Sequence, residues 1–195
     1  MKIITRNLSL RLSLNLFIEF GPILFFFIVF NIFDFIAATI SMVVVVLIAL
    51  ILSLYIEGRV AIFSLFASGS IIFFGAATVF LSNPTYIIFK DTLFWGLFFA
   101  IVLIYYLRDT LILKKLFIGI FDITDRGWKI VTIRWMVFAF LLASSNQIAL
   151  MYFSPAQWVN YKMITLIALI AFSIWQFLLS RKERNVNASP WGMRL

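Results

Sequence analysis

The chain has 195 residues, of which 64% are hydrophobic and only 12% charged, and its formal net charge is +8. Soluble domains are about half apolar and about a quarter charged. This composition therefore excludes an ordinary soluble domain and predicts an all-α, polytopic transmembrane helix bundle. The sequence contains no cysteine and no histidine, so disulfides, thiol nucleophiles, the usual zinc ligands and the commonest general base are missing. We expect no enzymatic activity, no cofactor and no metal site.

Six apolar segments are candidates for crossing a bilayer, which takes about 20 apolar residues. They cover residues 14–33, 35–56, 60–81, 88–107, 130–152 and 158–179. We predict one transmembrane domain over residues 14–180, preceded by a basic amino-terminal segment (1–13) and followed by a basic tail (181–195). The tail is polar from Asn185 onward and contains a proline, so we expect its end to be disordered.

The first segment leaves the number of crossings open. Gly21 and Pro22 interrupt its apolar run, and proline suits the first turn of a helix better than its interior. A helix from Pro22 to Phe33 would have only about 12 residues, too few to span comfortably. The alternative to six crossing helices is therefore five, with a re-entrant or interfacial first segment.

The distribution of basic residues predicts the orientation. With six crossings, all but three of the 16 lysines and arginines fall on one side of the membrane, the exceptions being Lys90, Arg134 and Lys162. Basic residues accumulate on the cytoplasmic side. We therefore expect both termini in the cytoplasm, whereas five crossings would put the amino terminus outside.

The connection over residues 108–129 is the only sizeable one. Its apolar residues fall at helical spacing with two lysines on the flank, which predicts a short helix on the inner leaflet, a solvated loop with apolar anchors being the alternative. These apolar residues are Leu113, Leu116, Phe117, Ile120 and Phe121. The side-chain oxygens of Asp122, Thr124 and Asp125 are placed to cap the next helix.

Charged groups inside lipid are costly, so each one is a candidate functional residue. Glu19 lies just before Gly21 and Pro22; it is either a proton or cation site or a cap for the helix that begins there. Lys90 with Asp91, Arg134 and Lys162 lie near the ends of segments, from where their side chains can reach the headgroups.

Uncharged candidates lie in the third, fifth and sixth segments and in the connection before the fifth. Asn146 belongs to the polar cluster 144–147, which we interpret as interhelical hydrogen bonding, with substrate contact as the alternative. We expect Trp128, Trp135 and Trp158 to anchor at the membrane interface, with a position in the packed interior as the alternative for Trp135. Small residues of the third segment would let it approach another helix closely; they include Gly69 and Gly75.

Several short motifs are informative through their order along the chain. They are Ile18-Glu19-Phe20-Gly21-Pro22, Ala37-Ala38-Thr39, Lys90-Asp91-Thr92, Gly127-Trp128, Arg134-Trp135, Asn146 and Trp158-Val159-Asn160-Tyr161-Lys162. In these motifs, residues 18–179 resemble the bacterial intracellular septation protein A family, the inner membrane-spanning proteins also called YciB. Two departures are that the family commonly has a proline where Asp91 stands and an acid where Gln147 stands.

The resemblance implies a multi-pass protein of the bacterial inner membrane that supports septation and cell envelope biogenesis. It implies action by contacts within the lipid bilayer, with proteins of the division or elongation machinery as partners, and not by catalysis. The rival hypothesis is a small transporter or lipid-handling protein that uses Glu19 and the polar groups of the fifth segment. Because the basic residues flank spans and form no single aromatic-interleaved surface, we expect no nucleic-acid partner.

Overall fold

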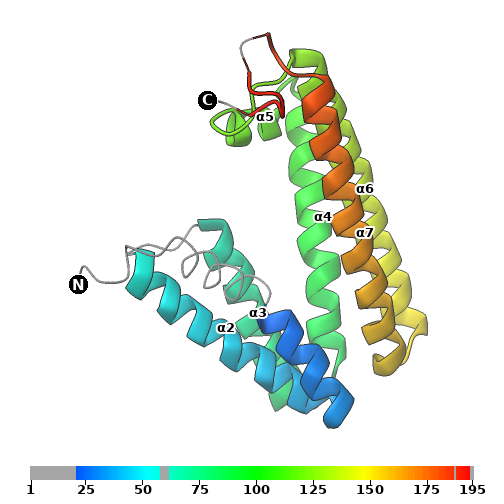
Figure 1. Ribbon diagram of the computed structural model, residues 1–195. Coiled ribbons are helices and arrows are strands. Elements are labelled where there is room, and N and C mark those ends of the chain that lie inside the picture. Colours follow the sequence, from blue (N-terminus) through cyan, green and yellow to red (C-terminus); the bar gives the residue numbers. More distant parts are fainter. Residues whose placement is uncertain (1–20, 58–61, 187, 194–195) are drawn as a thin grey trace. The chain divides into compact units, whose positions relative to one another are not determined.

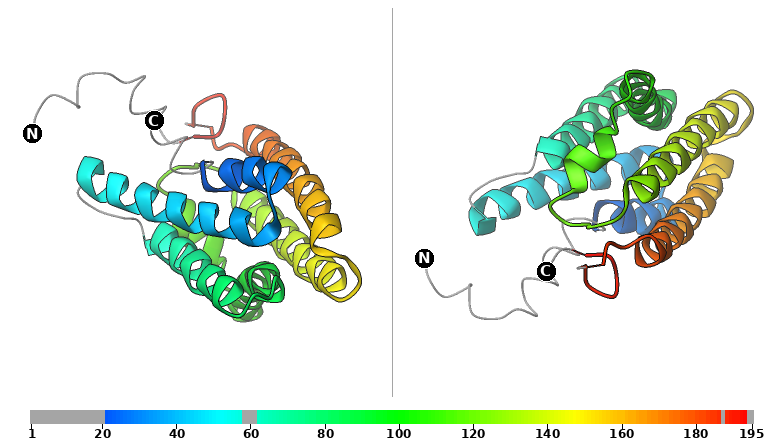
Figure 2. Two further views of the ribbon diagram at one scale, coloured as in Figure 1. Left: turned by 90° about the horizontal axis from the view of Figure 1, so that it is seen from below. Right: turned by 90° about the horizontal axis from the view of Figure 1, so that it is seen from above.

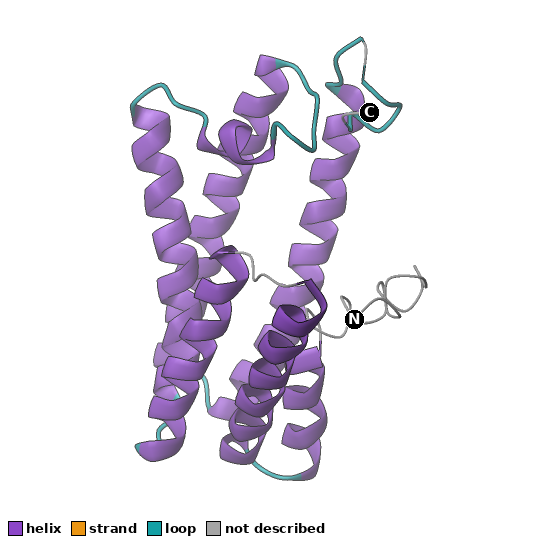
Figure 3. Cartoon of the chain, turned by 90° about the vertical axis from the view of Figure 1, so that its left-hand side faces the viewer, coloured by secondary structure: helices purple, strands orange, loops and turns teal. Residues whose placement is uncertain are grey.

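The computed structural model describes residues 21–57, 62–186 and 188–193, and these residues form helices and connecting loops with no extended strand (Figure 3). A first helix covers Gly21–Ile32. The labelled helices of Figure 1 are α2 (Phe35–Glu57), α3 (Ile62–Phe80), α4 (Thr85–Leu107), α5 (Ile112–Phe117), α6 (Asp125–Tyr152) and α7 (Pro155–Lys182). The predicted all-α membrane bundle is confirmed as a fold class.

Four helices in the described part are long and apolar enough to cross a membrane: Phe35–Tyr55, α4, α6 and α7. Two shorter apolar stretches, the helix Gly21–Ile32 and the part Leu65–Phe80 of α3, lie within the first and third predicted segments. Both of those segments begin at residues outside the described ranges. The choice between five and six crossings therefore stays a prediction.

The chain separates inside α4, after Lys90, into two compact units. In the first unit, Asp34 ends the connection after the first helix and caps α2, its Oδ1 accepting a hydrogen bond from the Ala37 N–H at 2.7 Å. Helices α2 and α3 pack closely at Gly75, where an added Cβ would lie 2.4 Å from the Val43 Cγ2. The predicted close approach is thus confirmed at Gly75; a Cβ at Gly69 would meet nothing within 4 Å.

The second unit is built on α4, α6 and α7. Helices α6 and α7 form an antiparallel hairpin and run alongside each other in both views of Figure 2. Their interior is aromatic: the rings of Phe138 and Phe172 stack with centroids 4.0 Å apart, and Trp135 packs edge-on against Phe172 at 4.9 Å. Phe98 brings α4 to the same cluster, at 6.2 Å from Trp135. Trp135 is half-buried and contacts the rings of α4 and α7, which agrees with the alternative given for it and not with an interfacial anchor.

Helices α6 and α7 begin earlier than the apolar segments predicted, at residue 125 instead of 130 and at 155 instead of 158. Thr124 caps α6, as expected, by accepting a hydrogen bond from the Gly127 N–H at 3.0 Å. Ser154 and Gln157 form a reciprocal capping box around Pro155 at the start of α7. Both caps satisfy backbone N–H groups that have no partner within the helix.

The expectation of a disordered carboxyl-terminal end is wrong for its described residues. After α7 the chain turns back toward the loop ahead of α6 (Figure 1), and we call the described residues 183–186 and 188–193 the return segment. The Glu183 carbonyl accepts from the Thr124 N–H at 2.8 Å, and Asp122 exchanges backbone hydrogen bonds with Asn185 and Gly192 at 3.1 and 2.9 Å. These bonds use main-chain groups, so a polar composition does not prevent them.

Candidate functional site

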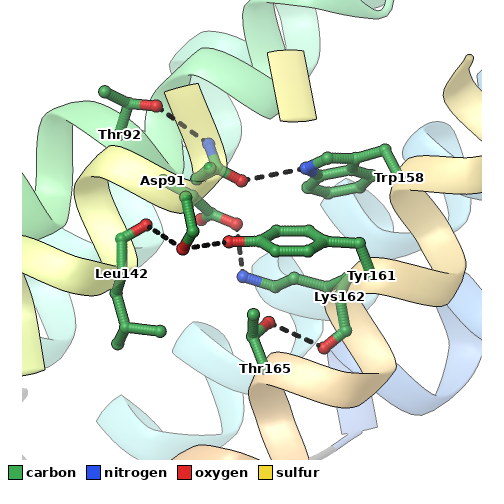
Figure 4. A network of polar contacts seen from close by, with 9 residues as sticks. Asp91, Thr92, Leu142, Trp158, Tyr161, Lys162 and Thr165 are labelled. Atoms are coloured by element: carbon green, nitrogen blue, oxygen red, sulfur yellow. Dashed lines mark hydrogen bonds and ion pairs between the residues drawn. The ribbon is translucent and has the colours of Figure 1, made fainter. Parts of the chain in front are cut away.

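The second unit brings polar side chains of α4, α6 and α7 together at one level, which Figure 4 shows from close by. Lys162 lies seven residues after the start of α7, a rise of about 10 Å. A 28-residue helix such as α7 is about 42 Å long, equal to the thickness of a bilayer with its headgroups, of which about 30 Å is hydrocarbon. A side chain 10 Å from the end of such a helix therefore lies just inside the hydrocarbon layer.

Asn146 joins the three helices through one amide. Its Nδ2 donates to the Thr92 Oγ1 on α4 at 2.9 Å, and its Oδ1 accepts from the Trp158 Nε1 on α7 at 2.9 Å. Because an indole N–H can only donate, it fixes which end of the amide faces Trp158. Asn146 is only 3% exposed. The interpretation of the polar cluster as interhelical hydrogen bonding is thus confirmed at this residue.

Asp91 and Lys162 form an ion pair between α4 and α7. Asp91 is only 6% exposed, and the Lys162 ammonium also lies 6.0 Å from the centroid of the Trp158 ring. A buried carboxylate in lipid is costly unless a cation pairs with it, and Lys162 supplies that cation. We expected Lys162 to reach toward the headgroups; the structure corrects this, because Asp91 offers a nearer partner.

Ser145 and Tyr161 complete the network beside the ion pair. The Ser145 Oγ lies 2.6 Å from the Leu141 carbonyl and 2.8 Å from the Tyr161 hydroxyl. Ser145 therefore donates to a carbonyl of its own helix and accepts from Tyr161, so that both hydroxyl groups have a hydrogen-bond partner. We call Asp91, Thr92, Ser145, Asn146, Trp158, Tyr161 and Lys162 the polar network.

The structure places Trp128 and Trp158 differently from the sequence expectation. Both side chains are covered by protein, at 3% and 4% exposed, so neither is an open interfacial anchor. Trp158 instead donates to Asn146, and Trp128 is buried near the start of α6. Tryptophan is frequent at membrane interfaces as a residue type, but a buried hydrogen-bond acceptor at the same level satisfies its N–H within the protein.

Among the remaining candidate residues, Arg134 has its aromatic contact away from the polar network. The Arg134 guanidinium of α6 lies 3.8 Å from the centroid of the Trp175 ring on α7, a cation–π contact. Lys90 is half-buried one residue before Asp91, and Gly21 and Pro22 are buried in the first turn of the helix Gly21–Ile32. Glu19 lies outside the described residues.

Sequence reasoning singled out Asp91, beside Lys90, and Ser145, in the cluster 144–147, but it did not predict that Asp91 pairs with Lys162, and it missed Tyr161. The signal for Asp91 was available, since Asp91 and Lys162 carry opposite charges at matching distances from the starts of the fourth and sixth segments. The chemistry of the network is that of a satisfied ion pair and amide. Within the described ranges, no three acidic residues cluster so as to hold a metal ion.

Comparisons with known proteins agree over most of the chain. The sequence model of the family described as intracellular septation protein A matches residues 14–185. An inner membrane-spanning protein YciB from Bradyrhizobium sp. (strain ORS 278) is 32% identical over 177 residues, covering 88% of this chain and 86% of that relative. One of the same name from Psychromonas ingrahamii is 25% identical over 181 residues, covering 89% and 96%. No solved structure matches the chain.

Proposed function

The chain belongs to the intracellular septation protein A family, and from this premise we propose that it supports septation and cell envelope biogenesis in the bacterial inner membrane without catalysing a reaction. In this proposal it acts as a helical membrane protein that contacts other membrane proteins of the division or elongation machinery. The observation that carries the proposal is the polar network, whose hydrogen-bonding groups are engaged with one another.

An engaged network favours a structural role over a substrate site. The Asn146 amide is bonded at both ends, and the Asp91 carboxylate is paired with Lys162. Polar side chains between membrane helices fix which helices associate and in which register. The rival function, a transporter or lipid-handling protein, needs polar groups that are open to a cargo, and its other candidate, Glu19, lies outside the described residues.

The outward faces of the second unit give the bundle surfaces for lipid or for helices of other proteins. Large apolar side chains are exposed along both helices of the hairpin, among them Val137, Phe140, Leu141, Ile148, Ile164, Ile167 and Ile174. With its polar groups turned inward and its apolar groups outward, the unit is suited to lateral contacts in the membrane.

Exchanging the two charges of the ion pair tests the proposal. In a bacterium that lacks its own family member and shows a septation defect, we expect Asp91→Lys and Lys162→Asp each to lose complementation. The double exchange, Asp91→Lys with Lys162→Asp, restores the ion pair and should restore septation. Lys129→Asp, which changes an exposed cation outside the network, is the matched control and should complement fully.

A chemical role for either charge gives a different result. A carboxylate that carries protons or a lysine that binds cargo cannot be moved to the opposite helix and keep its task. If the double exchange accumulates in the membrane at the normal level but fails to restore septation, the structural proposal is wrong. Cell length and septum number provide the readout, and quantitative blotting of the membrane fraction provides the level.

A further inference from the structure

An open pocket of about 640 Å³ lies at the carboxyl-terminal end of α7, and the polar network lies near the other end of this helix. Its lining contains three cations and no carboxylate, and we call it the C-terminal basic pocket. Its lining residues are Leu178, Arg181, Lys182, Arg184, Asn185 and Val186. The pocket lies wholly within the second unit, and all three cationic residues are exposed.

The only acid in this stretch is turned away from the pocket. Glu183 lies between Lys182 and Arg184 in sequence, but its Oε2 accepts from the Thr124 Oγ1 at 2.9 Å, on the side of α6. Among the described residues, no carboxylate forms an ion pair with the three pocket cations. The three cations are therefore not neutralised by an ion pair with a described carboxylate, and the Asp122 carboxylate, which accepts from the Nδ2 of the lining residue Asn185 at 2.6 Å, is not among the lining residues.

The return segment holds two of the cations in place. The Arg184 Nη1 lies 3.4 Å from the carbonyls of both Arg181 and Pro190, and the Arg181 guanidinium lies 5.0 Å from the centroid of the Trp191 ring. Trp191 in turn stacks on Phe177 of α7, with centroids 5.4 Å apart. Cations fixed by backbone and aromatic contacts lose less side-chain freedom when they bind an anion.

The position of the pocket along α7 indicates which anion it meets. Because α7 matches the full thickness of a bilayer, its last turn lies at the level of the headgroups. Leu178, one turn nearer the membrane centre, is half exposed, and Val186 is fully exposed. Cations at headgroup level beside exposed apolar side chains match a phospholipid, whose phosphate is joined to apolar chains.

We propose that the C-terminal basic pocket binds the phosphate headgroup of an anionic phospholipid, with Leu178 beside the first carbons of an acyl chain. Arg181, Lys182 and Arg184 surround the phosphate, and the return segment preorganises them. This goes beyond the proposed role in septation and does not depend on it.

Lipid titration of the purified full chain in a neutral detergent, followed by native mass spectrometry, tests the pocket. The probes are dioleoylphosphatidylglycerol and dioleoylphosphatidylcholine, which share acyl chains and differ in headgroup charge. Each basic residue near an anionic lipid contributes about fivefold in affinity, so we expect the phosphatidylglycerol to bind at least about tenfold more tightly. The triple variant Arg181→Gln, Lys182→Gln, Arg184→Gln should lose most of that preference.

A second triple variant provides the control for net charge. Lys115→Gln, Arg126→Gln, Lys129→Gln removes the same charge from exposed residues of α5 and the start of α6, and it should keep the preference within about twofold. Equal affinity for the two lipids, or equal loss in the two triple variants, overturns the proposal. Displacement of the lipid by millimolar inorganic phosphate also overturns it, because the pocket would then be a site for free phosphate.

Discussion

Replacing Asn146 with leucine tests whether one amide holds α4, α6 and α7 together. The substitution keeps a similar volume but removes the two hydrogen bonds to Thr92 and Trp158, each 2.9 Å long. Hydrogen bonds between membrane helices contribute about 0.6 kcal/mol on average and at most about 1.7 kcal/mol. The Trp158 N–H also loses its acceptor in a buried position, which costs about 1–3 kcal/mol. We expect the free energy of unfolding to fall by about 2–3 kcal/mol.

The assay is reversible unfolding of the reconstituted protein in mixed micelles by sodium dodecyl sulfate, followed by tryptophan fluorescence. Gln147→Leu is the matched control, because Gln147 is the next residue on α6 and also carries an amide side chain. That side-chain amide forms no hydrogen bond in the described part. Its substitution should change the free energy of unfolding by no more than about 0.5 kcal/mol.

A double-mutant cycle with Trp158→Phe isolates the Asn146–Trp158 bond. We expect a coupling free energy of about 1 kcal/mol, since each single variant already breaks the shared hydrogen bond. The reasoning is refuted if Asn146→Leu costs no more than Gln147→Leu, or if the two substitutions in the cycle are simply additive.

Three further perturbations follow from the second unit. Lys162→Met should lower the free energy of unfolding by about 3 kcal/mol, because it removes the cation that is paired with the buried Asp91 carboxylate. Asp91→Leu should cost about 1 kcal/mol, because Lys162 can then reach the headgroups, and equal losses in the same assay would contradict this. Gly127→Val should release the return segment, because even a Cβ at residue 127 would lie 2.8 Å from the Glu183 Cβ. Trypsin should then cut faster after the arginines of the tail, and an unchanged cleavage rate would argue against the contact. Gln176→Leu should raise the free energy of unfolding by about 1 kcal/mol, because no described residue bonds to this buried amide, and a decrease would show that the amide has a partner.

The long helices were predictable because each contains a long apolar run. Their starts were less so, since the first turns of α6 and α7 are polar and lie outside the apolar segments. The pattern of Ser154, Pro155 and Gln157 carries the sequence signature of a capping box with proline in the first turn, so the start of α7 could have been predicted from it. The Thr124 cap was predicted from the same kind of chemistry.

The contents of the polar network could be predicted only in part. Sequence gives the depth of a residue along its helix but not the direction in which its side chain points. Asp91 and Lys162 were both within reach of the headgroups by depth, and their pairing depends on how α4 and α7 are turned toward each other. The proline that the resemblance places at residue 91 could not form this pair, so the family pattern did not indicate it either.

The return segment was not predictable from composition. Three of its bonds to residues 122–124 join backbone groups, which every sequence carries, and polarity alone suggested disorder. Side-chain bonds from Thr124 to Glu183 and from Asn185 to Asp122 add to them. The glycines were the available signal. Gly192 adopts a positive φ of 71°, and Gly127 leaves room for Glu183 where any Cβ would collide.

The return segment also sets the order in which the protein can be completed during synthesis. Thr124 meets Glu183 across 59 residues of chain, so the start of α6 leaves the ribosome long before the residues that cover it. The start of α6 is therefore synthesised with that end open, and it can close only after the return segment has been synthesised. A reporter fused after residue 195 is attached next to the return segment, whereas a fusion at the amino terminus leaves the return segment unchanged.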